Sequence, residues 1–194
     1  MDCPQAKQAC RVQVAMATPL QIAPDDPGWV LKFESERDRI EHTLGKLARR
    51  IDHNGSTAVP ELEAKPIIDI QVSVKQLQPI HAYAGPLSTL GYVHMPHVDD
   101  AVCPFFHRPR KWPHTHHVHV VQSGGHEERS TLAFRDFLRD HREVAREYLG
   151  LKKQLAALVN EADPSSRESY ANAKREFIDH VVQIALAAGY PRWL

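Results

Sequence analysis

An apolar segment that carries one acidic residue, Ile67 to Val74, constrains the fold of this chain more than any other feature. An apolar run of this kind is typical of a strand in the interior of a sheet. Asp69 is the acid within it. A carboxylate is costly to bury unless a metal ion, a base or hydrogen-bond donors meet it. Asp69 is therefore the first candidate for chemistry.

A turn of small residues precedes this segment. The short strand Arg50 to Asn54 leads into Gly55 and Ser56, and Ser56 lies 13 residues before Asp69. Such a turn can present backbone N–H groups and a hydroxyl to a phosphate, although most Gly-Ser pairs are plain turns. A strand, a Gly-Ser turn and a second, acidic strand resemble the layout of the nucleotidyltransferase superfold. In that superfold the turn holds nucleotide phosphates, and strand carboxylates hold a divalent metal.

The wider pattern resembles the GrpB family. The two main matching stretches are His53–Pro60 and Ala64–Ile70. Shorter matches follow in order along the chain at Asp26–Trp29, Leu90–Tyr92, Phe105–Phe106, His117–Val120, Phe134–Arg139 and Tyr170–Ile178. Together they cover about residues 19–180. The resemblance implies the nucleotidyltransferase fold, and the family also occurs joined to dephospho-CoA kinase in some bacteria.

The resemblance and the apolar spacing together predict an α/β (α+β) fold, in which a nucleotidyltransferase-like mixed β-sheet is flanked by helices and followed by a helical C-terminal part. Residues 19–190 are expected to form a single domain, with a β/α part at 19–125 and a helical part at 126–190. Residues 1–18 have no clear periodicity and are expected to form a disordered extension.

Within the domain, strands are expected at 19–23, 50–54, 67–74, 91–94 and 117–121, and helices at 28–48 and 77–90. Residues 95–115 are expected to form a long loop, which in a compact domain is usually functional or disordered. Apolar residues from Phe134 to Leu158 predict two helices or one bent helix. Asp163 is expected to cap a further helix that stops at Gly189.

Charge and composition exclude several classes of partner. Lysine plus arginine and aspartate plus glutamate each number 24, so the formal net charge is zero and bulk nucleic-acid binding is not expected. No apolar run approaches the roughly 20 residues that span a bilayer, so membrane insertion is not expected either. The three cysteines form no CxxC pair. This predicts a reducing, cytoplasmic location without a disulfide framework.

The candidate metal ligands are Asp69, His117 and His119. Active members of the superfold carry two carboxylates at alternate positions of the acidic strand, and phosphoryl-transfer enzymes normally clamp two metals. Here the second position is Gln71, which brings no charge. The two histidines share one face of a strand. With Asp69 they would complete a two-histidine, one-carboxylate site for Mg²⁺ or another divalent ion. A polar network of His119 with Asp69, without a metal, is an equal alternative.

Basic residues near the suspected cleft would neutralise the charge of a phosphate. Lys65 directly precedes the acidic strand and is the candidate for a catalytic role beside Asp69, although an exposed loop lysine is the competing interpretation. The candidates for nucleotide or phosphate binding are the turn and three further basic residues, namely Gly55, Ser56, Thr57, Arg108, Arg135 and Lys174. Ordinary surface or interhelical packing is the alternative for the basic members of this set.

These features predict a protein that binds a nucleotide or another phosphorylated small molecule, with metal-dependent nucleotidyl transfer as its reaction. A non-catalytic ligand-binding or interaction module is the first alternative, because Gln71 stands where active members have a carboxylate. The second alternative is a metal-dependent hydrolase that uses Asp69 with the His117 and His119 pair.

Overall fold

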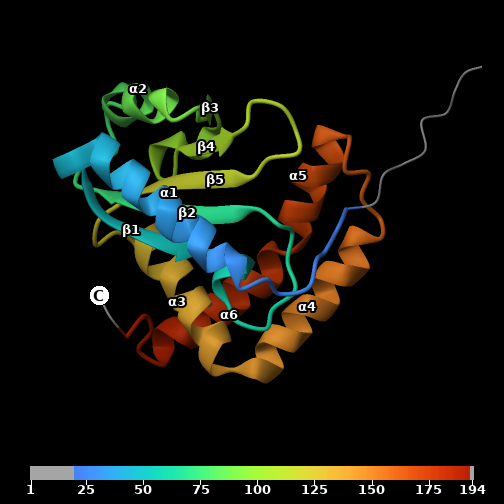
Figure 1. Cartoon of the computed structure of the whole chain (residues 1–194). Helices are drawn as coiled ribbons and strands as arrows, with labels where there is room; N and C mark the ends of the chain where they lie inside the picture. Colours follow the sequence, from blue (N-terminus) through green and yellow to red (C-terminus); the bar gives the residue numbers. More distant parts are fainter. Residues whose placement is uncertain (1–19, 193–194) are drawn as a thin grey trace, which may run out of the picture.

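A five-stranded mixed sheet in the order β1-β2-β5-β4-β3 forms the centre of the structure (Figure 1). The computed structural model describes residues 20–192, so the predicted N-terminal extension lies outside the described residues. The strands are β1 Ala48–Asn54, β2 Ile68–Val74, β3 Val93–Met95, β4 Phe105–Arg108 and β5 His116–Gln122. The helices are α1 Gly28–Leu44, α2 His81–Thr89, α3 His126–Asp140, α4 Arg142–Ala156, α5 Pro164–Ala173 and α6 Arg175–Ala187. Short 3-10 helices occupy Gly45–Leu47, Ser56–Ala58 and Val98–Ala101.

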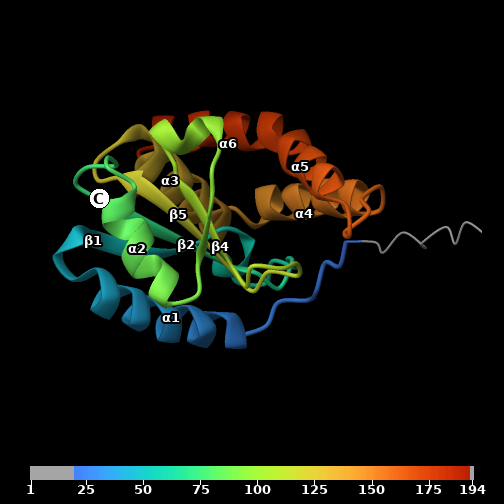
Figure 2. The same cartoon turned by 90° about the horizontal axis from the view of Figure 1, so that it is seen from above.

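Parallel pairing of β2 with β5 joins two antiparallel parts of the sheet. On one side β1 pairs with β2, and on the other β5 pairs with β4 and β4 with β3, all antiparallel. Helices α1 and α2 cover one face of the sheet, whereas α3 and α6 cover the other (Figure 2). Helices α4 and α5 stand beyond the end at which β2 and β5 begin (Figures 1 and 2). This arrangement confirms the predicted class, a mixed sheet flanked by helices with a helical C-terminal part.

The face of the sheet that packs on α1 and α2 is apolar. Alternate residues of the two parallel strands, Ile70 and Val72 on β2 and Val118 and Val120 on β5, are completely buried there. The α1 and α2 side chains in the same cluster are Trp29, Phe33, Ile40, Leu44, Tyr83 and Leu87. Burial of one such side chain contributes about 1.5–3 kcal/mol, so this cluster is the main apolar core. Because strand residues alternate, Asp69 and Gln71 of β2 and His117 and His119 of β5 lie on the opposite face.

Three segments differ from their predicted structure. Strand β4 lies inside the predicted loop at 95–115, where a proline on either side of four strand residues interrupts the apolar pattern. The last predicted helix is capped by Asp163, which accepts a hydrogen bond from the Ser165 N–H, but it breaks at Lys174 into α5 and α6. The described part of the predicted edge strand at 19–23 forms a single bridge, from Ala23 to Ala64.

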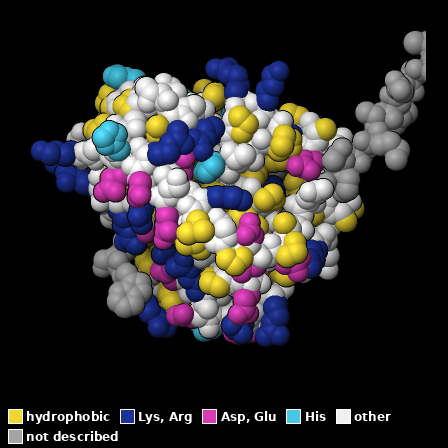
Figure 3. Space-filling view, viewed as in Figure 1, with side chains coloured by type: hydrophobic (Ala, Val, Ile, Leu, Met, Phe, Trp, Pro, Cys, Tyr) yellow, Lys and Arg dark blue, Asp and Glu magenta, His cyan; other side chains and the backbone are white. Residues whose placement is uncertain are grey.

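The distribution of charged side chains on the surface agrees with the zero formal net charge of the chain. On the face in Figure 3, basic and acidic side chains are intermingled over the helices instead of gathering in an extended patch of one sign. None of the helices within residues 20–192 is long and apolar enough to cross a lipid bilayer.

A buried carboxylate fixes the packing of α1 on the sheet. The Glu36 side chain is 4% exposed, and its Oε2 atom lies 3.0 Å from Arg108 Nη2 on β4 and 2.6 Å from Arg39 Nη1. The Tyr92 hydroxyl donates a hydrogen bond of 3.0 Å to the other oxygen, Oε1. Removal of one partner from a buried ion pair is strongly destabilising because the other charge stays buried without compensation.

The substitution Glu36→Gln is therefore expected to lower the free energy of unfolding by about 3 kcal/mol, since Arg108 loses its carboxylate partner. Urea denaturation measures the change. Glu41→Gln, an exposed position on the same helix, is the matched control and should stay within about 0.5 kcal/mol of the parent. Equal stability of the two variants would show that the Glu36 ion pair does not stabilise the packing of α1.

Candidate functional site

The parallel register of β2 and β5 brings three of the predicted residues together. It pairs Asp69 with His117 and Gln71 with His119. Asp69 Oδ1 lies 3.2 Å from His117 Nδ1 and 4.0 Å from His119 Nε2. One ligand atom from each of the three residues lies within 4.8 Å of the others. This cluster is half-buried at the edge of a cavity of about 270 Å³.

His117 is held at both ring nitrogens. Nδ1 faces Asp69, and Nε2 lies 3.1 Å from His114 Nδ1. The His114 ring stacks on His107 at 4.0 Å, and His107 Nδ1 lies 3.0 Å from the carbonyl oxygen of Pro109. Burial lowers the pKa of His114 to about 3, so this ring is neutral near pH 7. A fixed partner at the second nitrogen is the usual arrangement of a metal-ligating histidine.

The Asp69 carboxylate is stabilised in its charged form. Burial raises its pKa, but the hydrogen bond to His117 and the charges of His117, His119 and Lys174 outweigh that effect, so the net pKa lies below the ordinary value. Burial lowers the pKa of His119 to about 4, against the opposing attraction of Asp69. Near pH 7 the site thus offers a charged carboxylate at Asp69 and a neutral imidazole at His119.

Gly55 permits the Gly-Ser turn to pass directly beside Asp69. Its φ is +66°, and a Cβ atom added there would lie 2.9 Å from both Cβ and Cγ of Asp69. Ser56 and Thr57 follow it and line the cavity. The Thr57 hydroxyl is engaged with His53 Nε2 at 3.0 Å and donates a weaker hydrogen bond of 3.4 Å to the Ile67 carbonyl. The Ser56 side chain is hydrogen-bonded to Tyr148 of α4, so both turn hydroxyls have partners within the protein.

Three lysines line the same cavity, from three different elements: Lys65, Lys152 and Lys174. The Nζ atoms of Lys65 and Lys174 each lie 4.3 Å from the centroid of the Tyr170 ring. Burial lowers the pKa of all three, that of Lys174 to about 8 and that of Lys152 to about 7. One carboxylate therefore faces three amines in a confined space, which is an arrangement that favours an anionic ligand.

A smaller cavity of about 250 Å³ adjoins this site at His119. His119 Nδ1 lies 3.8 Å from Cys103 Sγ on this side, whereas Nε2 faces Asp69. Met95 and Phe105 supply much of the apolar lining, and the Phe105 ring centroid lies 5.0 Å from that of His119. An apolar group attached to a phosphate could lie in this second cavity while the phosphate faces the lysines.

Comparison with known proteins gives a consistent assignment. The family model described as "GrpB protein" matches residues 19–183. The chain belongs to the GrpB family. It is 34% identical to the glutamate-rich protein GrpB of Alkalihalophilus pseudofirmus, with 79% of this chain and 88% of that protein covered. The crystal structure of the conserved protein GrpB from Enterococcus faecalis superposes with a TM-score of 0.74 at 32% identity, covering 87% of this chain and 98% of that chain.

Other relatives are longer than the region they share with this GrpB-family chain. The UPF0157 protein YqkA of Bacillus subtilis is 34% identical over 77% of this chain, but the match spans 42% of its own length. A Mycobacterium leprae protein named dephospho-CoA kinase is 30% identical over 84% of this chain, and the match spans 46% of that protein. The shared region is thus about half of these two proteins.

Two of the predicted basic residues are not brought to the cavity in this GrpB-family structure. Arg108 points to the α1 side of the sheet, where it pairs with Glu36. Arg135 is buried on α3, where Nη1 donates a hydrogen bond of 3.0 Å to the His53 carbonyl and Nε lies 2.7 Å from Asp136 Oδ1. Both guanidinium groups thus bind partners within the fold, away from the cavity where they were predicted.

Gln71 does not line the cavity either. Its side chain is completely buried beneath α3, and its Oε1 atom accepts a hydrogen bond from the Thr131 hydroxyl. Gln71 thus forms a contact between the sheet and α3.

Lys152 is a site residue that sequence reasoning missed. Its side chain packs over the Tyr148 ring, and its Nζ atom donates a hydrogen bond of 2.6 Å to the Glu63 carbonyl. A signal was available, because Ala145, Tyr148, Lys152 and Ala156 lie on one face of α4 and are all buried. A lysine on the apolar face of a helix indicates a specific environment rather than a solvated surface.

The substitution Gly55→Ala is expected to destabilise the protein by about 2 kcal/mol or more, because the added Cβ is strained at positive φ and overlaps Asp69. Chemical denaturation measures this loss. Gly150→Ala, at an exposed position on α4 with open space around the added Cβ, is the control and should be neutral or stabilising by up to about 1 kcal/mol. Equal effects of the two substitutions would contradict the close approach of the turn to Asp69.

Proposed function

We propose that this GrpB-family protein binds a phosphorylated small molecule, with nucleotides and coenzyme A precursors as the first candidates. The main observation in support of this proposal is that one cavity is lined both by the cluster of Asp69, His117 and His119 and by the three lysines. The proposed phosphate lies against the lysines and the Ser56 hydroxyl. The adjoining apolar cavity beside His119 would take the organic part of the ligand. The relatives named dephospho-CoA kinase are the reason to include coenzyme A precursors.

The three clustered side chains fit a divalent metal. One carboxylate oxygen and two imidazole nitrogens are a donor set that suits Mn²⁺, Fe²⁺ or Zn²⁺ better than Mg²⁺, which prefers oxygen ligands. The proposed ligands are Asp69, His117 and His119, with His114 fixing the orientation of the His117 ring. When bound, such a metal would supply positive charge to polarise a phosphoryl oxygen.

The protein's own groups would act on the phosphate in complementary ways. Lys65 and Lys174 neutralise its negative charge, and their amines are held in place over the Tyr170 ring. The Gly55 turn brings a hydroxyl and backbone close to the same space. For nucleotidyl transfer, the lysines would stabilise the charge that develops on the leaving phosphate oxygens. The acceptor hydroxyl or amine would come from a second substrate.

A phosphoesterase reaction is the second candidate, and the position of Gln71 favours it. Transfer enzymes of the superfold normally use two metals held by several carboxylates. With Gln71 buried beneath α3, the described site has one carboxylate and ligands for one metal. A single metal held by two histidines and a carboxylate matches the pattern of catalytic sites that activate water.

Product analysis separates these functions. With Mn²⁺ and a nucleoside triphosphate, nucleotidyl transfer should release pyrophosphate when an acceptor is added. Hydrolysis should release phosphate from a simple ester without an acceptor. A binding module should show stabilisation alone, about 2.7 kcal/mol when the ligand is at 100 times its dissociation constant. No stabilisation by any phosphorylated compound, with or without metal, would contradict the proposal.

Mn²⁺ or Zn²⁺ is expected to bind the parent protein at one site per chain, and Asp69→Asn should weaken that binding by about tenfold or more because the charged ligand is lost. Calorimetric titration of protein purified without an affinity tag measures both. Asp179→Asn, at an exposed acid on α6, is the matched control and should leave metal binding unchanged. Equal binding by the Asp69 and Asp179 variants would exclude this metal site.

Sulfate, which remains a dianion across the tested range, is expected to bind about fivefold or more weakly at about pH 9.5 than at about pH 6.5. Lysine is charged below its pKa, and burial lowers the pKa of Lys174 to about 8 and that of Lys152 to about 7, so charge is lost as the pH rises. Lys174→Met should weaken binding at the lower pH and flatten the profile, whereas Lys46→Met, at an exposed position, should do neither. Affinity that is constant or rises with pH would contradict the lysine assignment.

A further inference from the structure

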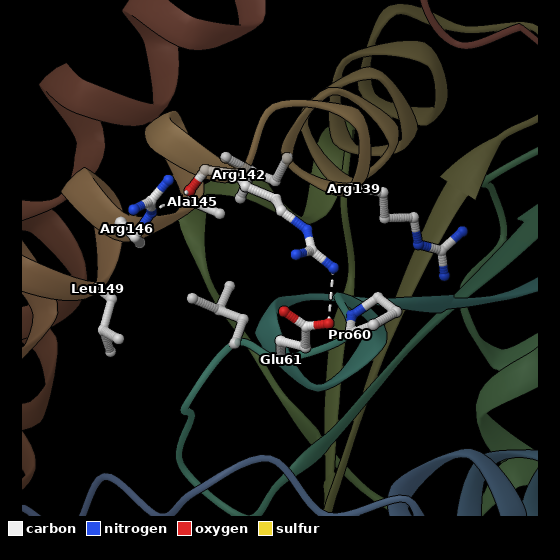
Figure 4. A pocket seen from close by; sticks show the side chains of 9 residues that line it. Pro60, Glu61, Arg139, Arg142, Ala145, Arg146 and Leu149 are labelled. Carbon is white, nitrogen blue, oxygen red and sulfur yellow. Dashed lines mark hydrogen bonds and ion pairs between the residues drawn. The ribbon is translucent and has the colours of Figure 1, made fainter.

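A third and larger cavity, of about 650 Å³, lies between the loop after the Gly-Ser turn and the corner where α3 meets α4 (Figure 4). It shares no lining residue with the cavity that contains Asp69. A cavity of this volume is within the range of small-molecule sites. Nothing in the proposed function uses it.

The floor of this cavity is apolar and rigid. Leu62 from the loop and Leu138 from α3 are 2% and 1% exposed, and they pack with Ala145 of α4 in one hydrophobic cluster. Pro60 and Leu149 extend the apolar lining on either side (Figure 4). A flat or branched hydrocarbon group would therefore find a preformed surface.

The rim carries an excess of positive charge, with three arginines and one glutamate. Arg139 is committed, because its Nε and Nη2 atoms donate hydrogen bonds of 2.9 and 2.7 Å to the Ala58 carbonyl. Arg146 donates through Nε to the Arg142 carbonyl at 3.2 Å, and no carboxylate of residues 20–192 lies within 4 Å of its guanidinium group. Arg142 and Arg146 are one helical turn apart, so both can reach one anion.

Arg142 is paired in a way that a ligand can replace. Its Nη2 atom lies 2.7 Å from Glu61 Oε1 across the cavity (Figure 4), with 73% and 68% of the two side chains exposed. Ion pairs this exposed contribute little stability. The Glu61 backbone is held at a φ of +64°, and its N–H donates a hydrogen bond of 2.8 Å to Asp25 Oδ2. The loop thus holds the base of the Glu61 side chain beside Arg142.

We propose that this cavity binds a small organic anion, an apolar group that carries a carboxylate or a phosphate. The apolar group lies on Leu62, Leu138 and Ala145. The anionic group bridges Arg142 and Arg146 and takes the place of the Glu61 carboxylate, because arginine binds planar oxyanions through two parallel hydrogen bonds. Glu61 therefore acts as an internal competitor for the ligand.

Two aromatic anions, phenylacetate and phenyl phosphate, serve as probes and distinguish a carboxylate from a phosphate. Phenylacetamide is the neutral counterpart. Acetate and inorganic phosphate are the anions without an apolar group. Amide chemical shifts of the ¹⁵N-labelled full chain, with a chelator present, report binding residue by residue. At least one of the two aromatic anions should produce saturable shifts at Leu62, Leu138 and Ala145 below about 20 mM. The neutral and the non-aromatic probes should bind at least about fivefold more weakly.

Two variants move the affinity in opposite directions. Arg146→Gln should weaken the binding of the aromatic anion about fivefold, since one of the two bridging charges is lost. Glu61→Gln should tighten it about threefold, since the competing carboxylate is removed. Arg129→Gln, an exposed position in the first turn of α3, is the matched control and should leave the affinity unchanged.

The result does not depend on the proposed phosphate site, since Asp69→Asn should bind the aromatic anions as the parent does. Unsaturable shifts with both aromatic anions, equal binding of phenylacetamide, or weaker binding by Glu61→Gln would each overturn the proposal. Equal binding of acetate or inorganic phosphate would overturn the role of the apolar floor.

Discussion

The parallel pairing of β2 with β5 is the contact on which both the fold and the candidate site depend. It sets Asp69 opposite His117 while it sets Ile70 opposite Val118 on the other face. Because side chains alternate along a strand, a slip by one residue would move both histidines into the apolar core against α1. The buried apolar face therefore specifies the register, and the register in turn places the acid beside the imidazoles.

The cavity beside these strands brings three lysines together with the Asp69 carboxylate. Lys65, Lys152 and Lys174 come from a loop, a helix and a helix junction, and the Asp69 carboxylate lines the cavity with them. Burial favours the neutral form of each amine, and lowered pKa values are the consequence. Such an arrangement costs stability in the free protein, and the proposed anion would offset that cost by pairing with the amines.

Several residues of the candidate site could be predicted from the sequence, and the physical reason differs for each of them. Asp69 stood out because a carboxylate interrupted an apolar strand pattern, and the two histidines stood out through their spacing. Arg108 was expected at the cleft because its strand was not recognised, so alternation could not be applied. In the structure Phe105 and His107 share the face of the site, whereas Phe106 and Arg108 point to α1. Lys152 was overlooked because its place on the buried face of α4 was not taken into account.

The sequence by itself determined the local pattern of this protein. Hydrophobic periodicity fixed most of its helices and strands, and the stretches His53–Pro60 and Ala64–Ile70 carried the resemblance to its family. Only the tertiary structure decided which distant residues meet. It paired Arg108 with Glu36, buried Gln71 under Thr131, and brought Lys152 and Lys174 to the Gly-Ser turn. Periodicity is a property of residues that are close together in the sequence. These contacts instead depend on strand register and on how helices pack around the whole core.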